Sequence, residues 1–237
     1  GILSSDRRLT NVLKAELKDV RKRFAKERAS IIQAEIDEIK LTMDVLIPSE
    51  ETIVTVTKDG YVKRTSPRSY NASNGQDFAM KESDYLLLEA NLNTQHHLLL
   101  FTSKGNFIYQ PVYELPDIRW KDLGQHISSI ISLDKDEEII QAIGLPNFDE
   151  KEAYVVTATK LGQMKRTALS EYKLARYNKA AKTMNVKAGD DMIYAAVVVE
   201  GQDIVLFANT SYAIRFPLSE IPPSGLRTGG VKAFALK

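Results

Sequence analysis

Few residues in this sequence could do acid–base or metal chemistry, and they are scattered. The chain has no cysteine, which excludes disulfides, thiolate nucleophiles and cysteine metal sites. The histidines are His96, His97 and His126, and no acidic residue stands at ligand spacing beside the adjacent pair. Asp190 and Asp191 begin a predicted strand, which is typical of turn residues rather than of an acid–base pair. We therefore predict no catalytic site and no metal site in this chain.

Nucleotide chemistry has equally little support in the sequence. Neither a G-x-x-x-x-G-K-[ST] phosphate loop nor a G-x-S-x-G nucleophile elbow occurs. The glycine-rich run 225–230 lacks the strand-then-helix context of a nucleotide loop. The distribution of charged residues is more informative than these motifs, because it bears on binding to a charged partner.

The basic residues are unevenly distributed. Overall, 32 basic residues stand against 31 acidic ones, a balance that by itself gives no argument for nucleic acid. Residues 98–150 contain 4 basic and 9 acidic residues, whereas residues 151–200 contain 9 basic and 5 acidic ones. Cations along one rim would neutralise phosphates and release counterions. The alternative interpretation is a loop kept soluble by its charge.

The elements that would position these cations form a repeat. Thr52–Tyr70 has an apolar run, a turn at Gly60 and a second run, which predicts a β-hairpin. Similar stretches cover 98–113, 153–172 and 203–222. Their turn positions are Gly60, Gly105, Gly162 and Ser211, at spacings of 45, 57 and 49 residues. A self-similar unit of this length predicts a propeller-like or solenoid array.

We place the four repeat units at about 49–97, 98–150, 151–200 and 201–237. Further strands are predicted in the second halves of the first three units, at 84–90, 138–143 and 190–196. The fourth unit reaches Lys237 before such a strand. We interpret the chain as a fragment of a longer one, or as one with a disordered remainder, with about four blades of which the last is incomplete.

The region before the repeats has a different pattern. Residues 1–29 carry an apolar stripe at helical spacing, with an N-cap at 4–6. Residues 30–47 alternate in a strand-like way, and Pro48 closes the segment. No apolar stretch approaches 18 residues and no signal peptide is found, so we expect no membrane partner and a cytoplasmic location.

The run 49–64, with its T-x-x-G-Y-x-K-R hairpin, resembles the first blade of the C-terminal domain of bacterial type IIA topoisomerase A subunits. The hairpin recurs in degenerate form at 159–166, and the resemblance covers the whole chain. It implies a mainly β fold, a β-pinwheel of four-stranded Greek-key blades that exchange strands, preceded by an N-terminal α-helix. Residues 1–47 would be a helix and lead-in strand from the cleavage core, and 48–237 the pinwheel.

The sequence departs from the family's gyrase members at one motif, and this departure narrows the resemblance to one branch of the family. Gyrase members carry a Q-R-R-G-G-R-G box, but residues 74–81 read NGQDFAMK, and a degenerate version stands at 225–232. This points to the topoisomerase IV (ParC-type) branch. The implied function is non-catalytic binding and bending of duplex DNA, presenting a segment to the cleavage core for decatenation and relaxation. The fragment would need no cofactor. The whole enzyme would need ATP, Mg²⁺ and the topoisomerase IV B subunit, and would be nucleoid-associated.

Two alternatives stay open: a gyrase A DNA-wrapping domain that has lost its box, and a propeller-like protein-interaction module.

For DNA binding, the predicted contacts are basic residues near turns and corners. Replacing the pair 165–166 is expected to cost little stability, because both residues come just after a turn. The ten predicted contacts are Lys63, Arg64, Lys165, Arg166, Arg176, Lys179, Lys182, Arg215, Arg227 and Lys232. The charge map assigns most binding to the unit 151–200 and little to Lys104 and Lys121 in the acidic unit.

Overall fold

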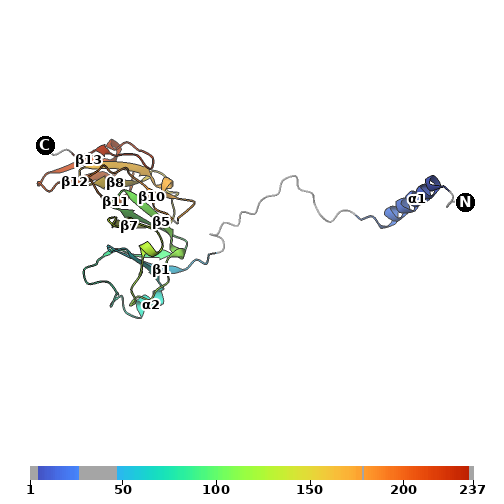
Figure 1. Cartoon of the computed structure of the whole chain (residues 1–237), viewed down its shortest axis with the longest axis horizontal. Coiled ribbons are helices and arrows are strands. Elements are labelled where there is room, and N and C mark those ends of the chain that lie inside the picture. Colours follow the sequence, from blue (N-terminus) through green and yellow to red (C-terminus); the bar gives the residue numbers. More distant parts are fainter. Residues whose placement is uncertain (1–4, 27–46, 178, 235–237) are drawn as a thin grey trace. The chain divides into compact units, whose positions relative to one another are not determined.

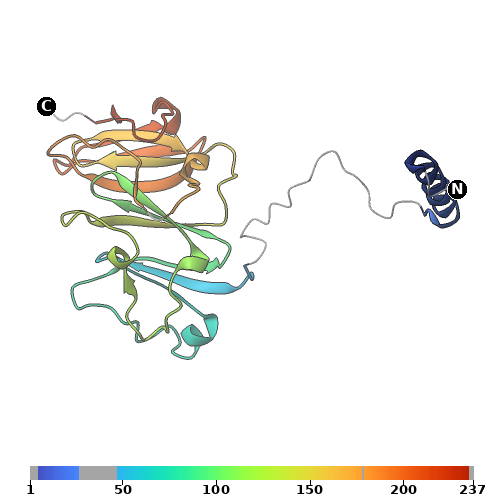
Figure 2. The ribbon, with the colours of Figure 1, turned by 45° about the vertical axis from the view of Figure 1, so that its right-hand side comes forward.

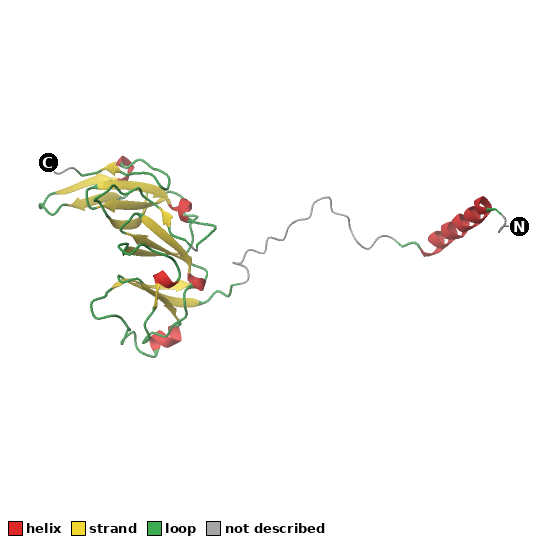
Figure 3. Cartoon of the chain, in the orientation of Figure 1, coloured by secondary structure: helices red, strands yellow, loops and turns green. Residues whose placement is uncertain are grey.

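The computed structural model describes residues 5–26, 47–177 and 179–234 (Figure 1). The chain divides into two compact units, Gly1–Leu41 and Thr42–Lys237. In the described residues the first unit contains one long helix, and the second contains β-sheets with short helical turns (Figure 3). The predicted mainly β fold with an N-terminal helix is confirmed.

Helix α1 (Asp6–Phe24) begins after Ser5, within the predicted N-cap. Its apolar stripe is exposed: Leu17 is 66% and Phe24 is 73% accessible. Within the described residues, no helix combines the length and the apolar character needed to cross a membrane. The predicted lead-in strand at 30–47 falls almost entirely outside the described residues, so it stays a prediction.

The second unit contains three four-stranded antiparallel sheets, which we call blades 1 to 3. Blade 1 has the order β3-β1-β2-β6, with β1 (Glu51–Thr57), β2 (Tyr61–Thr65), β3 (Leu86–Asn93) and β6 (Gln125–His126). Blade 2 has the order β10-β5-β4-β7, with β4 (His97–Thr102), β5 (Asn106–Pro111), β7 (Ile139–Leu145) and β10 (Ala181–Lys182). Blade 3 has the order β11-β8-β9-β14, with β8 (Ala153–Thr159), β9 (Gln163–Ala168), β11 (Met192–Val199) and β14 (Val231–Lys232).

The hairpin of β12 (Asp203–Phe207) and β13 (Ala213–Pro217) begins blade 4, with no further strand on it in the described residues. In Figure 2 the sheets follow one another in chain order, from blue to red. Short helical turns connect the strands: α2 (Pro67–Asn71), η3 (Val112–Glu114), η4 (Ile127–Ser129), η5 (Leu169–Tyr172) and η6 (Leu218–Glu220).

Each complete blade receives its fourth strand from the following unit. Strand β6 pairs with β2, β10 pairs with β5, and β14 pairs with β9. A parallel bridge from residue 64 to residue 117 adds a further link into blade 1. The exchange of strands implied by the family resemblance is therefore present, and a sequence unit is not the same set of residues as a blade.

The four predicted turn positions all have a positive φ. Gly60, Gly105 and Gly162 have φ values of +90°, +76° and +83°, and Ser211 has +67°. Glycine adopts this conformation without a steric penalty. At Gly105 and Gly162 a Cβ would also collide with a backbone oxygen of the exchanged segment, that of Met184 and that of Phe234 respectively. These glycines therefore let the next unit's chain pass closely over the hairpin.

The core consists of apolar layers between neighbouring blades. Along β4, Leu98 and Leu100 join the layer shared with blade 1, whereas Leu99 and Phe101 join the layer shared with blade 3. A strand buried on both faces reads as a continuous apolar run, which explains the sequence LLLF. The β12–β13 hairpin differs because one face is open: Phe207 is 82% and Val205 is 49% accessible.

Candidate nucleic-acid interface

The ten predicted DNA contacts differ greatly in exposure. Lys63 and Lys165 are each 1% accessible and Arg166 is 6% accessible. Arg64 and Lys182 are half-buried. The exposed members are Arg176, Lys179, Arg215, Arg227 and Lys232. Only the last group presents exposed cations, and among them Arg215 is paired with Asp203.

The Lys63 ammonium is enclosed inside blade 1. It donates to the carbonyl oxygens of Arg119, Trp120 and Asp122, at 3.1, 2.7 and 2.6 Å. It also lies 4.5 Å from the centre of the Phe78 ring. Burial lowers the pKa of Lys63 to about 8, against the opposing effect of Asp122. An ammonium has three N–H groups, so these carbonyls use all of its donors.

Lys165 repeats this arrangement in blade 3. Its ammonium donates to the carbonyl oxygens of Thr183 and Gly225, at 2.6 and 2.5 Å, and to the Thr228 hydroxyl at 3.1 Å. Burial lowers the pKa of Lys165 to about 8, and Glu171 acts in the opposite direction. The acceptors belong to the segments that cross onto blades 2 and 3. Lys165 therefore links both crossing segments to strand β9.

The neighbouring arginines also make internal contacts. Arg166 pairs with Glu200 at 2.7 Å, and its guanidinium lies 4.7 Å from the centre of the Tyr154 ring. Arg64 donates from Nε to the Leu115 carbonyl at 3.0 Å. The expectation that Lys63, Lys165 and Arg166 stand exposed on a rim is wrong. The small stability cost predicted for replacing residues 165 and 166 depends on exposed side chains, and both side chains are buried.

The exposed cations of residues 173–187 lie on a different blade from the one their position in the sequence suggests. This stretch contains five basic and no acidic residues. Strand β10 within it pairs with β5, and the Tyr177 hydroxyl donates to Glu114 at 3.1 Å, so the segment crosses onto blade 2. Assigning charge to blades by sequence unit is therefore wrong, because part of a basic stretch from the next unit lies on blade 2.

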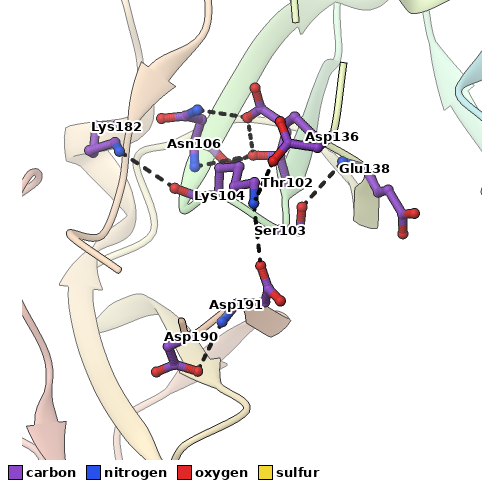
Figure 4. A network of polar contacts seen from close by, with 10 residues as sticks. Thr102, Ser103, Lys104, Asn106, Asp136, Glu138, Lys182, Asp190 and Asp191 are labelled. Carbon is purple, nitrogen blue, oxygen red and sulfur yellow. Dashed lines mark hydrogen bonds and ion pairs between the residues drawn. The ribbon is translucent and has the colours of Figure 1, made fainter. Parts of the chain in front are cut away.

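Lys104, a cation of the acidic unit 98–150, forms ion pairs with two aspartates of the protein. Its ammonium lies 3.0 Å from Asp136 and 3.7 Å from Asp191, which leads into β11 of blade 3 (Figure 4). Lys182 donates to the Lys104 carbonyl at 3.5 Å from the opposite side. Asp136 raises the pKa of Lys104 through a hydrogen bond. Lys104 thus joins two blades.

The acidic residues and the histidine considered for catalysis form hydrogen bonds that hold turns of the fold. The Asp190 carboxylate accepts from the backbone N–H groups of Leu161 and Asp191, and Asp84 holds the first hairpin in the same way through Asp59 and Tyr85. His96 accepts from the Asn93 N–H within a turn. No cluster of three or more potential metal ligands occurs among the described residues.

One group of cations is absent from the predicted DNA contacts, and the charge map assigns little binding to one of its members, Lys121. Arg68, Arg119 and Lys121 line the same hollow on blade 1, whose volume is about 560 Å³. Residues 119 and 121 belong to the second sequence unit and reach blade 1 through the crossing segment. No sequence pattern marks them, since 51 positions separate residues 68 and 119.

Comparison with known proteins supports the fold and the repeat boundaries. The family model described as the DNA gyrase C-terminal domain, β-propeller, matches residues 51–76, 96–144, 153–198 and 202–237. The A subunit of DNA topoisomerase 4 from Bacillus subtilis is 46% identical over 237 residues. The match covers 100% of this chain but 29% of that protein, so the chain corresponds to less than a third of its relative.

Solved structures agree with this. A crystal structure of the C-terminal domain of DNA topoisomerase IV has a TM-score of 0.76 and 51% identity, covering 81% of this chain and 59% of that one. The E. coli ParC C-terminal domain has a TM-score of 0.62 at 13% identity, covering 77% and 71%, which supports the fold alone. The chain therefore belongs to the DNA gyrase C-terminal domain family of β-propellers, and within it resembles topoisomerase IV A subunits.

Proposed function

We propose that this chain is a non-catalytic domain that binds and bends duplex DNA for a topoisomerase IV-type enzyme. It would present a DNA segment to the cleavage core during decatenation and relaxation. Family membership supports the assignment, and the observation that carries it is the segment 173–187. Its exposed cations Lys173, Arg176, Lys179 and Lys187 lie within 15 residues that contain no acidic residue.

The mode of binding follows from the type of surface. Cations on loops and crossing segments contact phosphates and carry no base code, and the described residues of the pinwheel form no long helix that could enter a major groove. Binding is therefore tolerant of sequence and sensitive to salt. About five phosphate contacts give a slope of log K against log salt near −4 to −5. Bending a short site costs on the order of 1–6 kcal/mol, offset by these contacts.

The fragment itself is proposed to need no cofactor, while the whole enzyme uses ATP, Mg²⁺ and a B subunit in the cytoplasm, at the nucleoid. Gel-shift and anisotropy titrations of the purified chain with plain duplex at two salt concentrations test DNA binding. Binding that is flat with salt, or confined to one short sequence, contradicts it. Reproducible nicking or relaxation by the chain alone contradicts the absence of catalysis.

The gyrase alternative is less well supported, because residues 74–81 lack the gyrase box and the identity to the topoisomerase 4 relative extends over the whole chain. Reconstituting the full-length enzyme separates the two functions. Decatenation without introduction of supercoils supports the topoisomerase IV assignment, whereas ATP-dependent negative supercoiling supports gyrase.

A further inference from the structure

We propose that the hollow on blade 1 is a fixed anchor for one phosphate group of the DNA backbone. This rests on the proposed DNA binding and adds a defined site to it. The hollow has a volume of about 560 Å³. Its walls are residues at and beside the α2 turn and residues 119, 121 and 122 of the crossing segment, which come from different sequence units.

The lining groups suit a phosphate. Three cations, Arg68, Arg119 and Lys121, line the hollow together with serines at and beside the α2 turn and one carboxylate, Asp122. Guanidinium groups bind phosphate oxygens in a bidentate manner, and an ammonium adds a point charge. The Ser66 and Ser69 hydroxyls accept hydrogen bonds within the protein and keep their O–H groups for phosphate oxygens, whereas the Ser73 hydroxyl already donates to a carbonyl. The chemistry recognised is thus a compact tetrahedral anion with several acceptor oxygens.

Two of these three cations are paired with carboxylates, but the pairs are weak enough to leave positive charge available for a phosphate. Arg119 Nε lies 2.9 Å from Asp122, and the Lys121 ammonium lies 2.8 Å from Asp77. Arg119 is 82% and Lys121 is 59% accessible on the side chain, so both pairs are open to water and weak. Arg68 is exposed and forms no ion pair within the described part of the chain. A phosphate can therefore draw these cations away from their carboxylates at little cost.

The hollow is held in shape from beneath. Lys63 binds the carbonyl oxygens of residues 119, 120 and 122, and the Trp120 backbone N–H donates to the Ser69 hydroxyl at 3.1 Å. The Thr65 hydroxyl donates to the Ile118 carbonyl at 2.7 Å. The crossing segment is thereby fixed against α2. Lys63 is a positioning residue for the anchor rather than a DNA contact.

Fluorescence anisotropy with a short labelled duplex tests the anchor. The variant is Arg68→Gln combined with Lys121→Gln. The matched control is Lys151→Gln combined with Lys160→Gln, which removes two exposed cations elsewhere. We expect the hollow variant to bind at least about tenfold more weakly than the control, with a salt slope less steep by about one per lost contact. Circular dichroism checks that both variants fold.

The possible outcomes are distinct. If the unaltered chain does not bind duplex, the proposed function itself fails. If it binds, and the hollow variant binds as well as the control, the anchor is wrong while DNA binding stands. The only tryptophan of the chain, Trp120, gives a local readout, because its backbone N–H donates to Ser69, which lines the hollow. Duplex should change its fluorescence in the unaltered chain and not in the hollow variant, and equal changes in both overturn the anchor.

Discussion

Strand β9 and the segment 173–187 that follows it are both rich in cations, yet they use charge in opposite ways. In β9, Lys165 and Arg166 are buried and satisfied by groups of the protein. In the following segment Arg176 and Lys179 are exposed, on chain that crosses to blade 2. The difference shows that a Lys-Arg pair in a strand can be part of the framework, while isolated cations in a crossing segment remain available for phosphate.

The largest expected effect is the loss of stability in Lys165→Ala. The substitution removes the lysine's hydrogen bonds to two carbonyls and a hydroxyl and opens a cavity, which should lower the free energy of unfolding by about 2–4 kcal/mol. Urea denaturation measures it, with Lys179→Ala as the exposed control expected within about 0.5 kcal/mol of the unaltered chain. Equal values for the two variants would remove the distinction between framework and surface cations.

The next effect concerns DNA affinity. Replacing Arg176, Lys179 and Lys187 together with Gln should weaken duplex binding by about tenfold or more, with a shallower salt slope, because three phosphate partners are lost. Stability should stay unchanged. The control carries Gln at Lys135, Lys151 and Lys160, which has the same net charge. If the control loses as much affinity, then overall charge and not this segment governs binding.

A smaller effect is expected in the pH dependence of stability. Burial lowers the pKa of Lys165 to about 8, whereas a lysine in an unfolded chain titrates at about 10.4. Between these values the unfolded chain holds a proton that the folded chain has released, so the free energy of unfolding rises with pH. The stability of the unaltered chain relative to Lys165→Met should therefore increase, on the order of 1 kcal/mol, from pH 8 to 10. A decrease over this range would show that the carbonyl acceptors raise the pKa instead.

The smallest effect is predicted for Arg215→Ala in β13. Arg215 occupies the place in its hairpin that Arg166 has in β9, but its partner Asp203, at 2.5 Å, is on the open surface. An exposed pair of this kind contributes about 0.2–1 kcal/mol. Thermal unfolding should shift only slightly. A loss comparable with that of Arg166→Ala would mean that exposure does not separate the two positions.

Sequence patterns predicted the hairpins well because each carries local information. Gly60, Gly105 and Gly162 mark turns that need a positive φ, and the apolar runs beside them mark strands buried on both faces. The strands of the second halves were also found, with β3 and β11 beginning two residues later than predicted. These features depend on nearest neighbours along the chain.

The candidate site was predicted less well because it depends on chain that returns from a distance. The exchanged strands β6, β10 and β14 are two residues long, too short for any periodicity. Without them, the acceptors of Lys63 and Lys165 could not be foreseen, and both lysines looked like surface charges. The same crossing brings Lys121 beside Arg68, which a charge count by sequence unit assigns to different blades.

The exchange of strands also determines where this protein can be shortened. A cut after residue 200 falls neatly between two repeats, yet it removes β14 from blade 3 and two of the three acceptors of Lys165. The last blade retained by any such cut would lose its edge strand, and a cut behind blade 1 or blade 3 would also take acceptors away from Lys63 or Lys165. Each repeat therefore supplies the edge strand that completes the blade before it. Any shortened domain would end in an incomplete blade.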